Sequence, residues 1–212
     1  FLWHSCKRYF YNHHVYKNRR PMTMPLVGKM ASLSEDWFIE KDTKEIDPDL
    51  SPGKIISSQK SLKADIVTDE ELSRKYTISG KIDLLIEFED GSYGIFDCKN
   101  TSGDSDKSWM YHTQLAAYKY CFEKMGLGEV SQIGLIYQII EGFYKSDDGT
   151  SNFTTEQKFV SVTPKMEQFE KLLSSVIQCL ESEVTPNSSP NCSFCKFAEN
   201  YNENLNLYSE DF

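Results

Sequence analysis

Two aspartates and one lysine, Asp83, Asp97 and Lys99, lie close together in the sequence. Magnesium binds oxygen ligands, and it commonly takes one or two protein carboxylates and completes its shell with water and substrate phosphate oxygens. A lysine ammonium beside such an ion can hold an attacking water and offset the charge that develops on a phosphoryl group. These residue types therefore predict a divalent-metal site that cleaves phosphodiester bonds.

The geometry of a β-hairpin decides whether the two aspartates can share one ion. Apolar alternation predicts strands over residues 76–88 and 93–98, joined through Glu89-Asp90-Gly91. A two-residue turn at Asp90-Gly91 would place Asp83 and Asp97 on opposite faces. A three-residue loop closed by Gly91 in the left-handed conformation places them directly across from each other, about 5 Å apart. The site therefore requires the three-residue loop, and the Cys98 carbonyl then completes an open half-shell of oxygen ligands.

The elements that must position this hairpin are predicted from periodicity. Apolar residues at three-to-four spacing predict helices over residues 27–41, 111–125 and 164–180, and an aromatic-rich segment without Gly or Pro predicts another over residues 1–17. Two further strand groups flank the hairpin, at 54–68 before it and at 130–140 and 158–162 after it, with a polar excursion over 145–155. We predict a single domain over 1–212, with an N-terminal helical segment (1–41), an α/β core (54–182) and a cysteine-containing tail (186–212).

Three short motifs occur in order along this framework: Gly80-Lys81-Ile82-Asp83, Asp97-Cys98-Lys99 and Gln114-Leu115-Ala116-Ala117-Tyr118. Together they resemble the PD-(D/E)XK nuclease superfamily, specifically its RecB-like exonuclease branch, which is related to CRISPR-adaptation and lambda-type exonucleases. The resemblance implies a three-layer, restriction-endonuclease-like α/β fold with a mixed sheet flanked by helices. It also implies metal ligation by Asp83 and Asp97, catalysis by Lys99, and a supporting or DNA-contacting role for Gln114 and Tyr118.

The activity that this resemblance implies is hydrolysis of single- or double-stranded DNA by metal-activated water with Mg²⁺ or Mn²⁺, without a covalent enzyme intermediate. An exonuclease of repair or mobile-element processing fits better than a site-specific cutter, because no sequence-reading module is visible. The rival from another class is a non-catalytic nucleic-acid-binding or assembly subunit that retains the fold. On the hairpin alone, a plain cross-strand ion pair is an equal alternative, and the sequence does not separate DNA from RNA as substrate.

The superfamily often supplies a further metal ligand from an upstream helix. Glu35, Asp36 and Glu40 are the acidic candidates in the predicted helix over 27–41, and we prefer Glu40. The alternative for each acid is that it belongs to the solvated face of an amphipathic helix.

The C-terminal tail carries Cys192-Ser193-Phe194-Cys195, a spacing at which two thiolates can bind one metal ion. The segment beginning at Cys6 resembles the N-terminal element that joins C-terminal cysteines around an iron-sulfur cluster in some RecB-like nucleases. This chain has Tyr9 and Tyr201 where a further cysteine is expected, and three thiols do not complete a cluster. Zinc bound by the three cysteines with His4 or His13, and loss of the metal altogether, remain as alternatives.

Charge is distributed unevenly along the chain. The formal net charge is −9, whereas residues 1–34 contain six Lys and Arg and no acidic residue, so this segment carries +6. Lys17, Arg19 and Arg20 are therefore candidate nucleic-acid contacts, with a solvated helix end as the alternative. Six cysteines are too few for a disulfide scaffold, and neither a signal peptide nor a membrane segment is apparent, so we expect a cytoplasmic protein.

Overall fold

The computed structural model describes residues 2–18, 25–66, 74–103 and 107–200. Contacts divide the chain into two compact units, a larger one of residues 23–69 and 75–169 and a smaller one of residues 1–22, 70–74 and 170–212. The single domain expected from the sequence stays a prediction.

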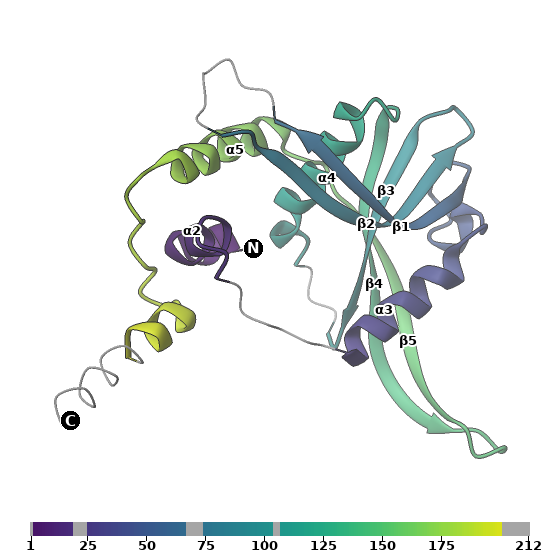
Figure 1. Ribbon diagram of the computed structural model, residues 1–212. Helices are drawn as coiled ribbons and strands as arrows, with labels where there is room; N and C mark the ends of the chain where they lie inside the picture. Colours follow the sequence, from purple (N-terminus) through teal and green to yellow (C-terminus); the bar gives the residue numbers. More distant parts are fainter. Residues whose placement is uncertain (1, 19–24, 67–73, 104–106, 201–212) are drawn as a thin grey trace. The chain divides into compact units, whose positions relative to one another are not determined.

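The larger unit is built on a five-stranded mixed sheet (Figure 1). Its strands follow sequence order: β1 (Gly53–Asp65), β2 (Thr77–Phe88), β3 (Tyr93–Thr101), β4 (Val130–Lys145) and β5 (Ser151–Ser161). All neighbouring pairs are antiparallel except β3 and β4, which are parallel. A parallel pair needs a long crossover, and the crossover here contains the short η2 (Ser108–Met110) and α4 (His112–Lys124).

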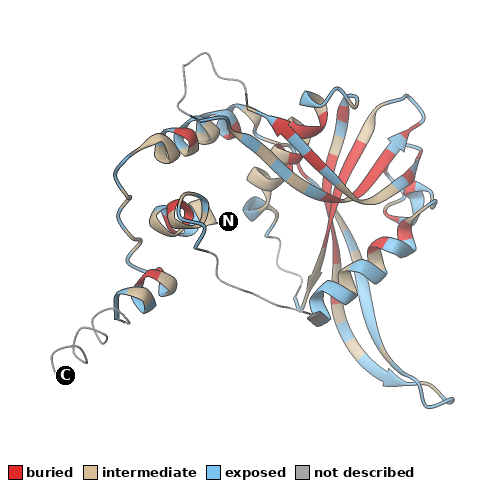
Figure 2. Cartoon of the chain, viewed as in Figure 1, coloured by how far each residue is buried: buried red, intermediate tan, exposed pale blue. Residues whose placement is uncertain are grey.

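Helices cover both faces of the sheet. On one face α4 contributes Leu115 and Phe122 to a core that includes Ile95 of β3. On the other face α3 (Pro25–Phe38) ends in the buried Phe38, and the segment with η1 (Thr43–Glu45) follows it into a second core around Phe96. Figure 2 shows the buried residues concentrated along the strands between these helices. The predicted α/β fold, a mixed sheet flanked by helices, is confirmed.

The polar excursion predicted over residues 145–155 is only partly correct, because residues 146–150 form a turn but Lys145 and residues 151–155 belong to β4 and β5, which pair as a long hairpin. This arm is exposed along most of its length on both strands (Figure 2). An arm with solvent on both faces has no apolar side to bury, so the period-two signal of a half-buried strand is missing. Phe143 and Phe153 pair near its end, with ring centroids 5.3 Å apart.

The loop between β2 and β3 has the three-residue length that the predicted metal site requires. Glu87 pairs with Tyr93 and Leu84 with Phe96. Gly91 closes the loop with φ +83°, and its amide donates to the Phe88 carbonyl at 3.0 Å. This left-handed conformation is one that glycine adopts without a steric penalty. The register expected from the sequence is confirmed.

The smaller unit contains the two ends of the described chain. The helix predicted over 1–17 is interrupted at Cys6, which leaves α1 (Leu2–Ser5) and α2 (Lys7–His14). Cys6 has extended backbone and caps α2 by accepting from the Tyr9 amide. Most of α5 (Met166–Glu181) and a helical segment over 193–200 also belong to this unit. No helix in the described part of the chain is long and apolar enough to cross a membrane.

Candidate active site

The two aspartates meet where the β2–β3 ladder ends. Leu84 and Phe96 form the last registered pair, and the next positions along the two strands are Asp83 and Asp97. At this point the Cys98 amide donates to Asp83 Oδ2 at 2.9 Å, so a carboxylate takes the place of a backbone acceptor. The Asp97 side chain is 1% exposed, and the Asp83 side chain is half-buried. The structure thus brings the two predicted ligands together.

Strand β1 is irregular opposite Asp83, where its regular pairing with β2 is interrupted. The β1–β2 register runs on both sides of Gln59 and Asp83 but omits this pair, and Gln59 has φ +53°. A non-glycine residue in the left-handed region is unfavourable and is concentrated at functional sites. Leu84 and Ile82 lie in the cores on opposite faces of the sheet, although two residues apart on one strand normally share a face. Asp83 therefore sits at a local distortion rather than within a regular ladder.

Lys99 lies against the Asp97 carboxylate. Its ammonium pairs with Asp97 Oδ2 and lies 5.0 Å from the centre of the Tyr111 ring. Burial alone would lower the pKa of Lys99, but the negative charges of Asp97 and Asp83 outweigh burial and raise it. Lys99 is therefore held as a cation beside the two carboxylates.

The carboxylates themselves are held in an environment that disfavours their negative charge. Burial is the largest cause, and it raises the pKa of Asp97 to about 6 against the opposing effect of Lys99. Burial likewise raises the pKa of Asp83, although the Cys98 amide and Lys99 oppose it. Lys99, and for Asp83 also Lys81, offset part of this negative charge, and a divalent cation would complement it further.

Gln114 and Tyr118 support Asp97 from α4. Gln114 Nε2 donates to Asp97 Oδ1 at 3.0 Å and lies 2.7 Å from the Tyr118 hydroxyl. The Tyr118 ring packs on Gly80, where an added Cβ would lie 2.7 Å from a ring carbon. The glycine of the first motif thus leaves room for the tyrosine of the third, which in turn positions the glutamine that holds Asp97.

Glu35 is the acidic residue of α3 that reaches this site. It is 2% exposed, and the Gln59 side-chain amide donates to it. Burial raises the pKa of Glu35, and the charge of Asp83 raises it further. Glu40, which we preferred from the sequence, is exposed and follows the end of α3 with φ +66°. The signal for Glu35 was its spacing from Phe38, because positions three apart on a helix share a face.

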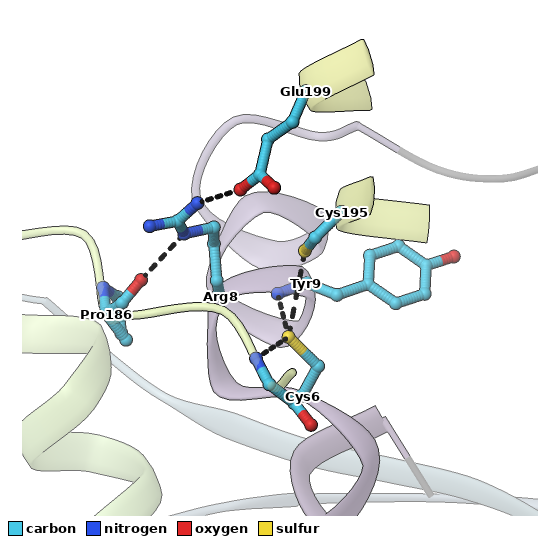
Figure 3. A network of polar contacts seen from close by, with 7 residues as sticks. Cys6, Arg8, Tyr9, Pro186, Cys195 and Glu199 are labelled. Carbon is cyan, nitrogen blue, oxygen red and sulfur yellow. Dashed lines mark hydrogen bonds and ion pairs between the residues drawn. The ribbon is translucent and has the colours of Figure 1, made fainter. Parts of the chain in front are cut away.

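The three tail and N-terminal cysteines also converge, within the smaller unit. The sulfur atoms of Cys6, Cys192 and Cys195 all lie within 4.8 Å of one another, and all three residues are buried. Cys6 Sγ lies 3.7 Å from Cys195 Sγ and accepts from the Ser189 amide at 3.3 Å (Figure 3). Burial raises the pKa of Cys6, but the amides of Ser189 and Tyr9 outweigh it and lower this pKa, while burial raises the pKa of Cys195 to about 12.

The two other cysteines in the strand and helix motifs are ordinary core residues. Cys98 and Cys121 are both buried, one in each core. Burial and the neighbouring carboxylates raise the pKa of Cys98, so this thiol stays protonated. The side chain of Cys98 therefore takes no part in the metal site, and only its backbone is a candidate ligand.

The predicted basic contacts are only partly described. Lys17 is exposed and donates to the His14 carbonyl at 2.8 Å. Arg19 and Arg20 lie outside the described residues. Their contact with nucleic acid stays a prediction.

Buried carboxylates beside a lysine are a residue set that could hold a divalent cation and use it to activate a phosphoryl group and a water. The model of the PD-(D/E)XK nuclease superfamily matches residues 30–199 of this chain. The chain therefore belongs to this superfamily, whose members are generally metal-dependent phosphodiesterases, and its sheet and helices are consistent with a restriction-endonuclease-like core.

Comparisons with solved structures and with curated proteins do not define the family more narrowly. A solved structure described as "Crystal structure of SSO0001" is similar to 82% of this chain and 67% of its own, with 15% identity and a TM-score of 0.45. No curated protein matches the chain.

The residues present fit the divalent metal that the superfamily typically uses. Asp97 is nearly fully buried. Among the described residues its Oδ2 atom makes an ion pair with Lys99 but accepts no hydrogen bond. Asp83 adds a carboxylate from the neighbouring strand, and Glu35 of α3 interacts with Asp83, although the described residues do not bring all three carboxylates within 4.8 Å of one another. Such an oxygen-rich set suits Mg²⁺ or Mn²⁺, whereas the separate cysteine cluster suits a thiophilic metal, either zinc or iron-sulfur.

Proposed function

We propose that this site hydrolyses phosphodiester bonds of DNA with Mg²⁺ or Mn²⁺, and that the protein is an exonuclease of the RecB-like branch. The observation that carries the proposal is the meeting of Asp83, Asp97 and Lys99 at the end of one hairpin. The ordered motifs support the branch, since the third motif reaches Asp97 through Gln114.

The proposed ligands are Asp83, Asp97 and the Cys98 carbonyl, with Glu35 in the upstream position in place of Glu40. When bound, a divalent ion supplies Lewis-acid activation of the scissile phosphate and of the attacking water. Lys99 is held as a cation by two carboxylates, and its ammonium would orient that water and offset the charge developing on the phosphoryl oxygens.

Gln114 and Tyr118 act on the chemistry through Asp97 and are positioning residues. The amide of Gln114 fixes one oxygen of Asp97 while Lys99 engages the other. This division orients the carboxylate plane in advance, and such supporting contacts typically change metal affinity or activity by about 10- to 100-fold when removed.

The test is a cleavage assay on end-labelled single- and double-stranded DNA and RNA, with Mg²⁺, Mn²⁺ or EDTA. We expect metal-dependent release of short products from DNA ends, abolished by EDTA and by Lys99→Ala. Lys124→Ala, which removes an exposed lysine at the end of α4, is the matched control and should retain activity.

Three outcomes would overturn parts of this proposal. Absence of metal-dependent cleavage on every substrate would favour the non-catalytic subunit. Preference for RNA would reject DNA as the substrate, and internal cuts in a circular substrate at the rate of end release would reject the exonuclease.

A further inference from the structure

We propose that Cys6, Cys192 and Cys195 bind one thiophilic metal ion, with zinc as the natural occupant, through three thiolates and a water at the fourth position. The site joins the first described helices to the C-terminal segment of the smaller unit. It would lie where some RecB-like nucleases hold an iron-sulfur cluster, a cluster that the sequence of this chain leaves incomplete, and it does not depend on the proposed nuclease activity.

The spacing of the sulfur atoms matches ligands that share one ion. Zinc-thiolate bonds are about 2.3 Å long, so two thiolates at the corners of a zinc tetrahedron lie about 3.8 Å apart. Cys6 Sγ and Cys195 Sγ are 3.7 Å apart, and Cys192 joins them within 4.8 Å. In a [4Fe–4S] cluster each cysteine ligates a different iron, which separates the thiolates more widely.

The surroundings of Cys6 are those of a metal-held thiolate. Its sulfur accepts from two backbone amides, Ser189 at 3.3 Å and Tyr9 at 3.5 Å. Donors of this kind fix the orientation of a metal ligand from outside the coordination shell. The Tyr9 ring stacks on Phe194 with centroids 4.2 Å apart, and it packs against the three cysteines.

The two chain segments are also held together without help from the sulfur atoms. Arg8 donates to the Pro186 carbonyl at 3.0 Å and pairs with Glu199 at 2.8 Å (Figure 3). Tyr11 adds a bond from its hydroxyl to the Ser182 carbonyl at 2.9 Å. The three thiols are therefore brought together by a network of neighbouring contacts, which reduces the cost of assembling the site on binding.

The number of thiols argues against a cluster. Iron-sulfur clusters are typically held by four cysteines, and among the residues that the structure describes only these three gather. Cys98 and Cys121 belong to the cores of the larger unit. Neither His4 nor His13 is part of the group, so the histidine ligand considered from the sequence is not supplied.

The first experiment measures the metal in the whole chain, purified without oxygen or chelator. We expect about one zinc per chain by elemental analysis, without stoichiometric iron or acid-labile sulfide. Exchange with Co²⁺ should produce thiolate-to-cobalt absorption in the near ultraviolet and the intense visible bands of tetrahedral cobalt. Removal by a chelator and return of Co²⁺ to the refolded or still-folded apoprotein should restore these bands.

The second experiment assigns the ligands. Cys192→Ser and Cys6→Ser should each lose most of the bound metal, whereas Cys179→Ser, which removes a thiol outside the group, should retain it. Far-ultraviolet circular dichroism of each variant identifies any that fails to fold, and the chelator experiment on the wild-type chain tests the site without a substitution.

Four results would overturn the proposal. Iron with sulfide and a broad visible absorption would establish a cluster. A mass lower by two hydrogens under non-reducing conditions would establish a disulfide between two of the thiols. A metal-free chain that takes up no Co²⁺ would establish a purely structural thiol cluster, and equal metal in Cys192→Ser and wild type would place the ion elsewhere.

Discussion

The carboxylate site and the cysteine cluster both gather buried groups of one kind, but they are assembled over very different distances in the sequence. Asp83 and Asp97 lie on adjacent strands of one hairpin, and a three-residue loop determines that they meet. Cys6 and Cys195 lie 189 positions apart and meet only because the N-terminal helices pack against the segment over 182–200 within the smaller unit. The first site follows from local geometry, whereas the second follows from tertiary structure.

The two sites also differ in how far they destabilise the folded protein when no metal is bound. Both carboxylates carry raised pKa values, since burial disfavours their charge and, for Asp97, the charge of Asp83 does so as well. Thiols can remain protonated and neutral in a buried site, so the metal-free cysteine cluster carries no such charge penalty. At the carboxylate site, substitutions that remove charge should therefore reduce cleavage without reducing the stability of the metal-free protein.

The largest expected effect is at Asp97. Asp97→Asn removes a ligand charge and the Lys99 ion pair, and it should lower the cleavage rate by about a thousandfold, the equivalent of the several kcal/mol that a catalytic metal contributes. The measurement is single-turnover cleavage at saturating Mn²⁺. Asp148→Asn, in an exposed turn, is the control. If the metal content of the cysteine cluster fell together with the rate, the two sites would not be independent.

A smaller effect is expected at the upstream carboxylate. Glu35→Gln should weaken Mn²⁺ binding by about 10- to 100-fold, because Glu35 is buried and interacts with Asp83. Glu40→Gln should leave binding unchanged, since Glu40 is exposed beyond the end of α3. The dependence of cleavage rate on Mn²⁺ concentration compares the two. The reverse ranking would restore Glu40 as the upstream ligand.

The packing of Gly80 on Tyr118 gives the next prediction. Gly80→Ala would place a Cβ 2.7 Å from the Tyr118 ring, and overpacking of this kind typically costs about 1–3 kcal/mol of unfolding free energy. Displacement of Tyr118 should also loosen Gln114 and reduce cleavage. Urea denaturation and the cleavage assay measure the two effects. Gly28→Ala on α3, where nothing lies within 4 Å, should cause neither.

Much of the carboxylate site was predictable because strands and loops obey short-range rules. The faces of Asp97 and Lys99 followed from strand alternation, and Gly91 followed from the loop length that the register required. The distortion at Gln59 was not predictable, because its left-handed backbone depends on tertiary contacts that override local preference. Glu35 was a candidate but Glu40 was preferred, because an acidic residue on a helix normally faces solvent and nothing local marks the one that is buried.

The cysteine cluster was only partly predictable for a different reason. The spacing of Cys192 and Cys195 indicated a pair of ligands, but nothing local indicates which distant residue joins them. The resemblance supplied Cys6, and the structure excludes His4 and His13 from the group. The exposed β4–β5 arm was also not predictable from local sequence. Its two strands pair with each other and bury neither face, so they lack the apolar alternation by which a strand is recognised.

The smallest expected effect tests the charge penalty directly, at Asp83. Burial raises the pKa of this carboxyl, so its ionised form destabilises the metal-free protein near neutral pH. Asp83→Asn removes the charge, and the amide oxygen of asparagine can still accept from the Cys98 amide. In EDTA, we expect the Tm to rise by about 2–4 °C, the shift that corresponds to roughly 1 kcal/mol in a chain of this size.

Adding Mn²⁺ should reverse the order of the two Tm values, so that the wild-type chain melts at a higher temperature than Asp83→Asn. The wild-type chain gains stability because the ion binds only the folded state, whereas Asp83→Asn has lost a ligand and should gain little. Asp90→Asn is the matched control, since the Ser92 hydroxyl and amide lower the pKa of Asp90 and favour its charge. This variant should not raise the Tm in EDTA. A lower Tm for Asp83→Asn in EDTA would mean that the Asp83 charge stabilises the hairpin, and the carboxylate site would then be structural before it is catalytic.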